Sequence, residues 1–184
     1  MTSPRVRPRW PRLLFGALLL PMALGFMGFL LPARARVERR LEIRGPATEV
    51  FARVATLRRW PDWTAWTTNR FPDMQVSFEG PESGVGAMMV ASGKSSGDGR
   101  VTLLTAEPGT GIRYRLDFDH GFQLFDGTIR WEPAGDVLTV TWTVEGDMGW
   151  NPLRRWGGLF LGTLMGGDMD AGLANLQRQV EAAK

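Results

Sequence analysis

Six short segments between residues 71 and 145 alternate apolar and polar side chains, and they constrain the fold more than any other feature of the chain. They span residues 71–80, 84–92, 100–106, 112–118, 122–132 and 137–145. Alternation with a period of two is typical of strands that bury one face. Because short turns join these segments, neighbouring strands must be antiparallel. The prediction is a meander with one apolar face, which requires a cover.

The last apolar stretch, residues 151–182, is long enough for a helix of many turns and is the predicted cover. Its apolar side chains form two stripes at helical spacing: Leu153, Trp156, Phe160 and Leu164, then Met169, Leu173, Leu176 and Val180. Such stripes are typical of buried helix faces. The phase slips near Gly166-Gly167, which predicts either a bend at that point or a helix covered on both sides.

The elements that precede the meander complete the predicted domain. Residues 36–44 alternate as a first strand, and Pro46 begins a predicted helix that ends at Leu57. The run Trp60-Pro61-Asp62-Trp63 predicts a second, short helix. The predicted order is therefore β-αα-β6-α. It describes an α+β domain of about seven strands in residues 36–184, after a separate N-terminal region of residues 1–35.

The N-terminal region has the composition of a membrane segment. Residues 13–31 are nineteen positions without a charge, about the length needed to cross a hydrocarbon core. Arginines flank the segment, and the additional amino-terminal charge favours a single-pass transmembrane anchor in the cell membrane with the domain on the extracytoplasmic side. Two alternatives stay open. Ala33-Arg34-Ala35 has the form of a signal-peptide cleavage site, and the segment could also be a buried helix of a soluble protein.

The distribution of charge argues against nucleic acid as a partner. Eight of the 22 basic residues and one of the 19 acidic residues lie in the first 40 positions, so the remaining 144 carry 14 basic and 18 acidic residues. A nucleic-acid interface needs a basic face. The chain has no cysteine and one histidine, which excludes thiolate chemistry and metal sites built from several of these residues. No metal and no cofactor are expected.

An ordered set of residues in the domain resembles a known family. The set comprises Val37-Glu38-Arg39, Ile43, Gly45 to Phe51, Leu57 to Trp63, Gly80-Pro81, Gly84 to Ala87, Gly97 to Gly99 and Gly172-Leu173. It is similar to the polyketide cyclase/dehydrase branch of the START-like (SRPBCC) superfamily. The resemblance implies a helix-grip fold, in which a curved antiparallel sheet surrounds a long C-terminal helix and leaves a cavity for an apolar ligand. It does not establish an activity, because the superfamily holds carriers and sensors as well as enzymes.

Inward strand positions and the first half of the C-terminal helix supply the candidate cavity. We predict that it is lined by Trp66, Met88, Tyr114, Ile129, Trp131, Trp142, Phe160 and Leu164. Trp66 is the predicted gate, and the Tyr114 hydroxyl and the indole N–H groups are the polar groups expected to orient a ligand. Gly162 and Gly166 would leave room for that ligand. The alternative is that these side chains simply fill the interior.

Catalytic residues cannot be named from the sequence. His120 lies between two predicted strands, where a hairpin tip faces solvent, and we interpret it as a turn residue. No Gly-x-Ser-x-Gly motif supports a serine nucleophile, and residues 93–99 lack the spacing of a phosphate-binding loop. Asp168 and Asp170 are better explained by helix capping or solvated positions than by acid–base work.

Three functions stay open. The apolar cavity and the N-terminal segment favour a membrane-tethered domain that binds a hydrophobic small molecule or lipid. The alternatives are a cyclase- or dehydratase-type enzyme without metal, and a structural or partner-binding domain with a filled core. The sequence indicates neither the ligand nor the oligomeric state.

Overall fold

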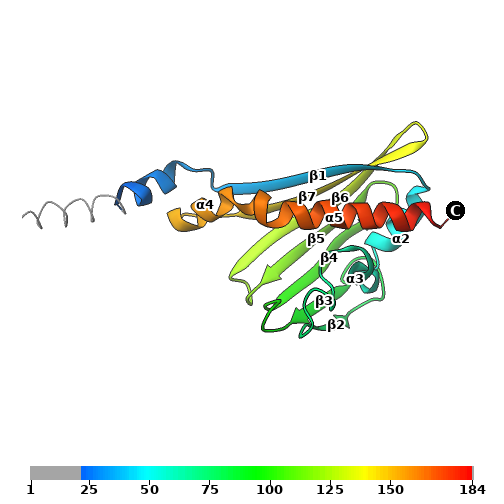
Figure 1. The fold of residues 1–184 in the computed structure, drawn as a ribbon, viewed down its shortest axis with the longest axis horizontal. Coiled ribbons are helices and arrows are strands. Elements are labelled where there is room, and N and C mark those ends of the chain that lie inside the picture. Colours follow the sequence, from blue (N-terminus) through cyan, green and yellow to red (C-terminus); the bar gives the residue numbers. More distant parts are fainter. Residues whose placement is uncertain (1–21, 184) are drawn as a thin grey trace, which may run out of the picture.

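The computed structural model describes residues 22–183, and its central element is an antiparallel sheet of seven strands. The strands are β1 (Arg34–Ile43), β2 (Gln75–Glu79), β3 (Met88–Ser92), β4 (Gly99–Glu107), β5 (Gly111–Phe118), β6 (Gln123–Ala134) and β7 (Val137–Asp147). Their order is β1-β7-β6-β5-β4-β3-β2, so the first strand pairs with the last and the others form the predicted meander. The sheet curves around a long helix (Figure 1).

Short helices follow β1, and longer ones end the chain. They are α2 (Ala47–Val54), the 3₁₀ turn η1 (Leu57–Arg59), α3 (Trp60–Trp63), α4 (Pro152–Leu159) and α5 (Leu161–Glu181). Helix α5 crosses the sheet and contacts β1, α2 and α3 (Figure 1). The predicted α+β order is confirmed, except that the final helix is divided in two.

The C-terminal helix is interrupted at Phe160 and continues through Gly166-Gly167, so the predicted position of the bend is wrong. Two glycines, Gly157 and Gly158, lie in the last turn of α4 before the interruption, and glycine is a poor helix former. The Phe160 N–H donates to the Gly157 carbonyl at 3.0 Å, which tightens the last turn of α4. Gly166-Gly167 stays helical inside α5, where Gly166 is buried.

The two predicted apolar stripes differ in their environment. Met169, Leu173, Leu176 and Val180 are buried against the sheet, as predicted. The stripe in the first half of the segment was also predicted to be buried. This prediction is wrong, because Leu153, Phe160 and Leu164 are exposed. Helix α4 lies at the end of the sheet, next to the N-terminal helix, rather than across the sheet (Figure 1).

The predicted membrane segment is described in part. Residues 22–30 form a helix, whereas residues 13–21 lie outside the described residues. Within residues 22–183, no helix has both the length and the apolar character needed to span a membrane.

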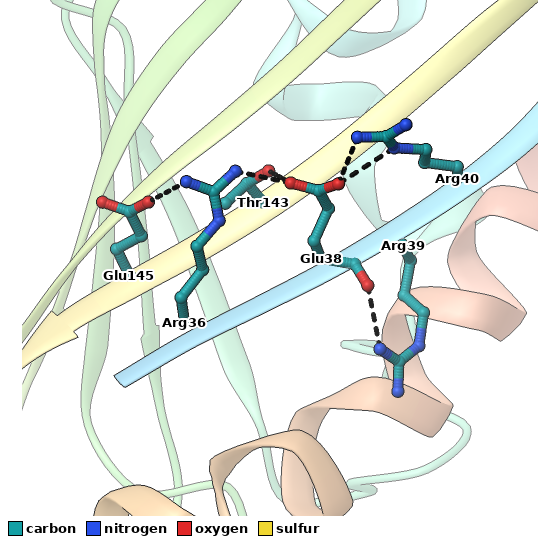
Figure 2. A network of polar contacts seen from close by, with 6 residues as sticks. All are labelled: Arg36, Glu38, Arg39, Arg40, Thr143 and Glu145. Carbon is teal, nitrogen blue, oxygen red and sulfur yellow. Dashed lines mark hydrogen bonds and ion pairs between the residues drawn. The ribbon is translucent and has the colours of Figure 1, made fainter. Parts of the chain in front are cut away.

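Arg39 connects β1 to α5. Its side chain points to the opposite side of the strand from Arg36 and Arg40 (Figure 2). Its Nε atom lies 3.1 Å from Asp170 Oδ2 on α5, and its guanidinium occupies the space that a Cβ atom of Gly166 would need. The expectation that Gly166 leaves room for a ligand is therefore wrong, because this glycine makes room for Arg39.

The outer face of β1 carries a row of ion pairs (Figure 2). Glu38 accepts hydrogen bonds from Arg36 and Arg40, and Arg36 Nη1 also donates to Glu145 Oε1 at 2.8 Å. The arginines and Glu145 are largely exposed and Glu38 is half-buried, so solvent screens much of their attraction. The hydrogen bonds from Arg36 and then Arg40 lower the pKa of Glu38 below its ordinary value of 4.5.

Arg36→Gln is expected to raise the pKa of Glu38, because it removes the largest cause of the lowered value. A carboxyl group whose pKa is lowered by folding stabilises the native state above its unfolded-state pKa, and it loses that contribution as the pH falls through the folded-state pKa. The ion pairs should therefore stabilise the protein at neutral pH and stop doing so in acid below pH 4.5. Carbon-detected NMR of the Glu38 carboxyl measures the pKa, with Arg34→Gln as the control. An identical titration in both variants would contradict the assignment.

Candidate functional site

A half-open pocket of about 390 Å³ lies between the inner face of the sheet and the first half of α5. Strands β3 to β7 form its floor, and the residues that follow α3 form one wall. Its apolar lining comprises Trp60, Ala65, Trp66, Met89, Val101, Tyr114, Leu116, Phe118, Phe125, Trp142, Val144, Leu161, Leu164, Met165 and Met169. The polar residues at the rim are Ser96, Asp98, Asp119, Gln123 and Asp168, next to Gly97, whereas Thr64 is buried in the wall. The volume is within the range of small-molecule sites.

The structure brings together half of the residues predicted to line a cavity. Trp66, Tyr114, Trp142 and Leu164 line the pocket. The remaining four lie elsewhere: Met88, Ile129, Trp131 and Phe160.

Each of these four differs for a physical reason. Residues 84–87 do not join a strand, so the alternation in β3 begins at Met88, and Met89 is the side chain that faces inward. Ile129 and Trp131 are buried in the filled part of the interior, where the Trp131 ring packs against Phe51 of α2 at 6.2 Å. Phe160 is exposed at the interruption between α4 and α5.

Several lining residues were absent from the predicted set although the sequence carried a signal for some of them. Leu116 and Phe118 share the inward phase of Tyr114 in β5, and Phe125 shares the phase of β6. Leu161 and Met165 extend the stripe of Met169 towards the start of α5 at a spacing of four residues, and the bend predicted at Gly166-Gly167 concealed this continuity.

Tyr114 and Trp142 form a buried polar contact in the floor of the pocket. The Trp142 Nε1–H donates a hydrogen bond to the Tyr114 hydroxyl oxygen at 2.7 Å. Burial raises the pKa of Tyr114 above its ordinary value, and the hydrogen bond from Trp142 opposes that shift in part. Tyr114 is therefore a neutral phenol at physiological pH. Within residues 22–183 its O–H donates to no protein acceptor.

Four glycines allow the aromatic rings of the pocket to lie close to the backbone. A Cβ atom at any of them would lie 3.1 Å or less from a ring. The pairs are Gly127 with Tyr114, Gly146 with Phe125, Gly172 with Trp142 and Gly99 with Trp66. Overpacking displaces side chains from their preferred positions. The shape of the floor therefore depends on the absence of side chains at these positions.

Trp60, Trp63 and Trp66 differ in their environment. Trp60 and Trp63 are buried in the core, where their rings pack at 5.4 Å and Trp63 also meets Trp142 at 5.3 Å. Trp66 is half-buried at the pocket, with its ring centroid 5.3 Å from that of Phe118. Trp60 therefore lines the pocket from the core, Trp63 packs behind it, and Trp66 lines the pocket with part of its ring exposed.

The charged groups near the pocket lie at its rim. His120 is in the turn between β5 and β6 with a left-handed backbone, as predicted, and its Nε2 is 3.6 Å from Asp98 Oδ2. Asp168 and Asp170 each pair with a different arginine and do not form an acid–base pair. Among the described residues, no three histidine or acidic side chains are grouped so that they could hold a metal ion.

Comparisons with known proteins agree with this geometry. A family model described as "Polyketide cyclase / dehydrase and lipid transport" matches residues 34–181. A search of the curated proteins found no match. Truncated norcoclaurine synthase from Thalictrum flavum is similar in structure, with a TM-score of 0.60 and 13% identity over 80% of this chain and 93% of that chain.

Two further solved structures share the architecture. The di-domain ARO/CYC StfQ from the steffimycin biosynthetic pathway has a TM-score of 0.64 and 10% identity over 82% of this chain and 52% of that chain, so the present chain spans about half of the di-domain. Ara h 8.0201 has a TM-score of 0.54 and 15% identity over 78% of this chain and 97% of that chain. At these identities the similarities establish a common helix-grip fold.

Proposed function

Because the chain belongs to the polyketide cyclase/dehydrase and lipid transport family, as its sequence resemblance predicted, we propose that it binds a hydrophobic small molecule or lipid between the sheet and α5. The observation that carries the proposal is the pocket itself, which has a mainly apolar lining that includes six aromatic side chains. At roughly 25 cal/mol per Å², burial of about 300 Å² of apolar ligand surface corresponds to about 7 kcal/mol before the costs of association.

The polar groups narrow the class of ligand. Tyr114 offers a single hydrogen-bond donor in the floor. The carboxylates of Asp98 and Asp119 stand at the rim beside Asp168, which is paired with Arg70, and they disfavour a negatively charged ligand. The preferred ligand therefore has an apolar body and one neutral oxygen acceptor, such as a ketone, ester or phenol.

The pocket supports binding better than it supports the two alternatives. Its interior contains one titratable group, Tyr114, whose raised pKa makes it a weak acid near neutral pH. This is a poor match for a cyclase or dehydratase that transfers protons. An open volume of about 390 Å³ also argues against a domain whose core is filled.

A membrane tether is the second part of the proposal. The uncharged residues 13–31 would hold the domain at the cell membrane as a single-pass anchor, with the domain on the extracytoplasmic side. The structure describes the last part of this segment as a helix of residues 22–30. Because this helix ends only a few residues before β1, the anchored domain would lie directly beside the bilayer. Co-sedimentation of the full chain with phospholipid vesicles measures the tether, and recovery of the chain in the supernatant would exclude it.

Two fluorescent probes test the pocket and the role of Tyr114. Prodan is an aromatic ketone, whereas N-phenylnaphthylamine has an apolar body without a carbonyl group. Both are expected to bind the purified protein with increased fluorescence. Tyr114→Phe should weaken binding of prodan about tenfold and leave the other probe unchanged, because one hydrogen bond contributes about 1–1.5 kcal/mol.

The outcomes separate the parts of this proposal. Absence of binding by both probes would refute a ligand-binding pocket. Equal loss of both probes in Tyr114→Phe would show that Tyr114 shapes the cavity rather than orienting a ligand. Thermal unfolding of the variant is the control, since the substitution also removes the acceptor of the Trp142 hydrogen bond.

A further inference from the structure

The large apolar side chains that face solvent gather at one end of the domain. Among residues 22–183, all such side chains except Val85 belong to the N-terminal helix, the β5–β6 hairpin near its turn, or the segment from residue 150 to 164. The most exposed include Phe26 at 68%, Phe122 at 64%, Trp150 at 83%, Leu153 at 74%, Phe160 at 58% and Leu164 at 71%. We name this set of segments the apolar end. Clustered exposure of this kind marks an interaction surface.

Direct contacts join the three segments into one surface. The Phe29 and Trp150 rings pack edge to face at 6.2 Å, which connects the N-terminal helix to the residues that precede α4. Arg154 on α4 lies over the Phe122 ring at 5.4 Å and donates to the Phe122 carbonyl at 2.9 Å. Helix α4 also lies beside the N-terminal helix in Figure 1. The apolar end is therefore continuous from residues 22–30 across α4 to the β5–β6 turn.

The apolar end borders the mouth of the pocket. Leu164 belongs to both, since it lines the pocket and is exposed. Phe118 and Gln123, which flank the β5–β6 turn, also line the pocket. A flat partner seated on the apolar end would consequently meet the opening through which a ligand enters.

The chemistry of the surface identifies the partner. Residues 148–165 contain two arginines, no acidic residue, and exposed tryptophan, phenylalanine and leucine side chains. This composition is typical of helices that lie in the interface of a bilayer. The helix of residues 22–30, which belongs to the uncharged segment 13–31, lies at the same end of the domain. We infer that the apolar end docks on the surface of a phospholipid bilayer, with the mouth of the pocket facing the lipid.

Docking gives the pocket a direct route of exchange with the membrane. An apolar ligand could pass between the acyl chains and the cavity without crossing water, which removes the cost of exposing its surface during transfer. The inference rests on the proposed tether and pocket, and its test measures a different quantity, the depth of the apolar end in the bilayer.

The absence of cysteine allows a site-specific test with the full chain. An environment-sensitive NBD label is placed at L153C on α4 and, as a matched control, at D136C in the β6–β7 turn. Figure 1 shows that turn at the far end of β1 from α4. The protein is bound to phosphatidylcholine–phosphatidylglycerol vesicles that contain a nitroxide-labelled lipid. We expect a blue shift at residue 153 and about fivefold stronger quenching there than at residue 136.

The double variant W150S/F160S is expected to reduce quenching at residue 153 by about threefold without changing co-sedimentation, because it removes two large apolar contacts with the lipid. Equal and weak quenching at both positions would overturn the docking inference while leaving the tether and the pocket intact. A blue shift at residue 153 that appears without vesicles and increases with protein concentration would identify a second copy as the partner instead. If the chain did not co-sediment with the vesicles, both the docking and the tether would be refuted. The titrations with the two fluorescent probes would then test the pocket independently.

Discussion

Gly127→Val is expected to bring the domain close to unfolding. Gly127 in β6 is paired directly with Tyr114 in β5, and the Tyr114 ring covers the position where a Cβ atom would stand. The ring cannot move away easily, because it is fully buried, meets Trp60 at 5.0 Å and accepts a hydrogen bond from Trp142. Ordinary overpacking costs about 1–3 kcal/mol, and three added carbons that overlap a fixed ring exceed that range.

A graded series makes this prediction quantitative. Gly127→Ala should lower the free energy of unfolding by about 3 kcal/mol, and Gly127→Val should consume most of the 5–15 kcal/mol that is typical of a domain. Gly109→Ala and Gly109→Val are the matched controls, since that turn glycine has open space around it and should tolerate both changes. Urea unfolding followed by circular dichroism measures the series. A Gly127→Val protein as stable as the wild type would show that the Tyr114 ring does not rest on β6.

Ala65→Phe is expected to abolish binding of both fluorescent probes while the fold is retained. Ala65 lines the pocket from the segment after α3, and it is half-buried rather than part of the packed core. A phenyl ring added here can enter the open volume of the pocket without displacing buried side chains. Since the pocket is small, about 390 Å³, we expect at least about a tenfold loss of affinity for each probe.

The control for this variant is the same substitution at an exposed position remote from the pocket. Ala134→Phe, at the end of β6, should bind both probes as the wild type does. Thermal unfolding of Ala65→Phe shows whether the fold persists. Unchanged binding in a folded Ala65→Phe protein would place the probes at a different site and would count against the proposed function.

Alternation along the strands was sufficient to place much of the candidate site. The pattern in β5 correctly put Tyr114, Leu116 and Phe118 on the inward face, because a strand that packs on one side leaves a period of two in its sequence. The same reasoning was off by one residue in β3, where Met89 and not Met88 faces the pocket. A change of one residue reverses the face of every side chain in a strand, and the sequence does not mark where the strand begins.

The sequence by itself determined the family, the α+β order of elements and the buried half of the final helix. Each of these depends on periodicity and on residues close together in the chain. Only the tertiary structure decided that Leu153, Phe160 and Leu164 are exposed, because an amphipathic pattern indicates that a face is apolar but not whether anything covers it. It likewise decided that Gly127 lies under Tyr114 and that Gly166 makes room for Arg39. These are contacts between distant segments, and they exist only once the sheet has curved around α5.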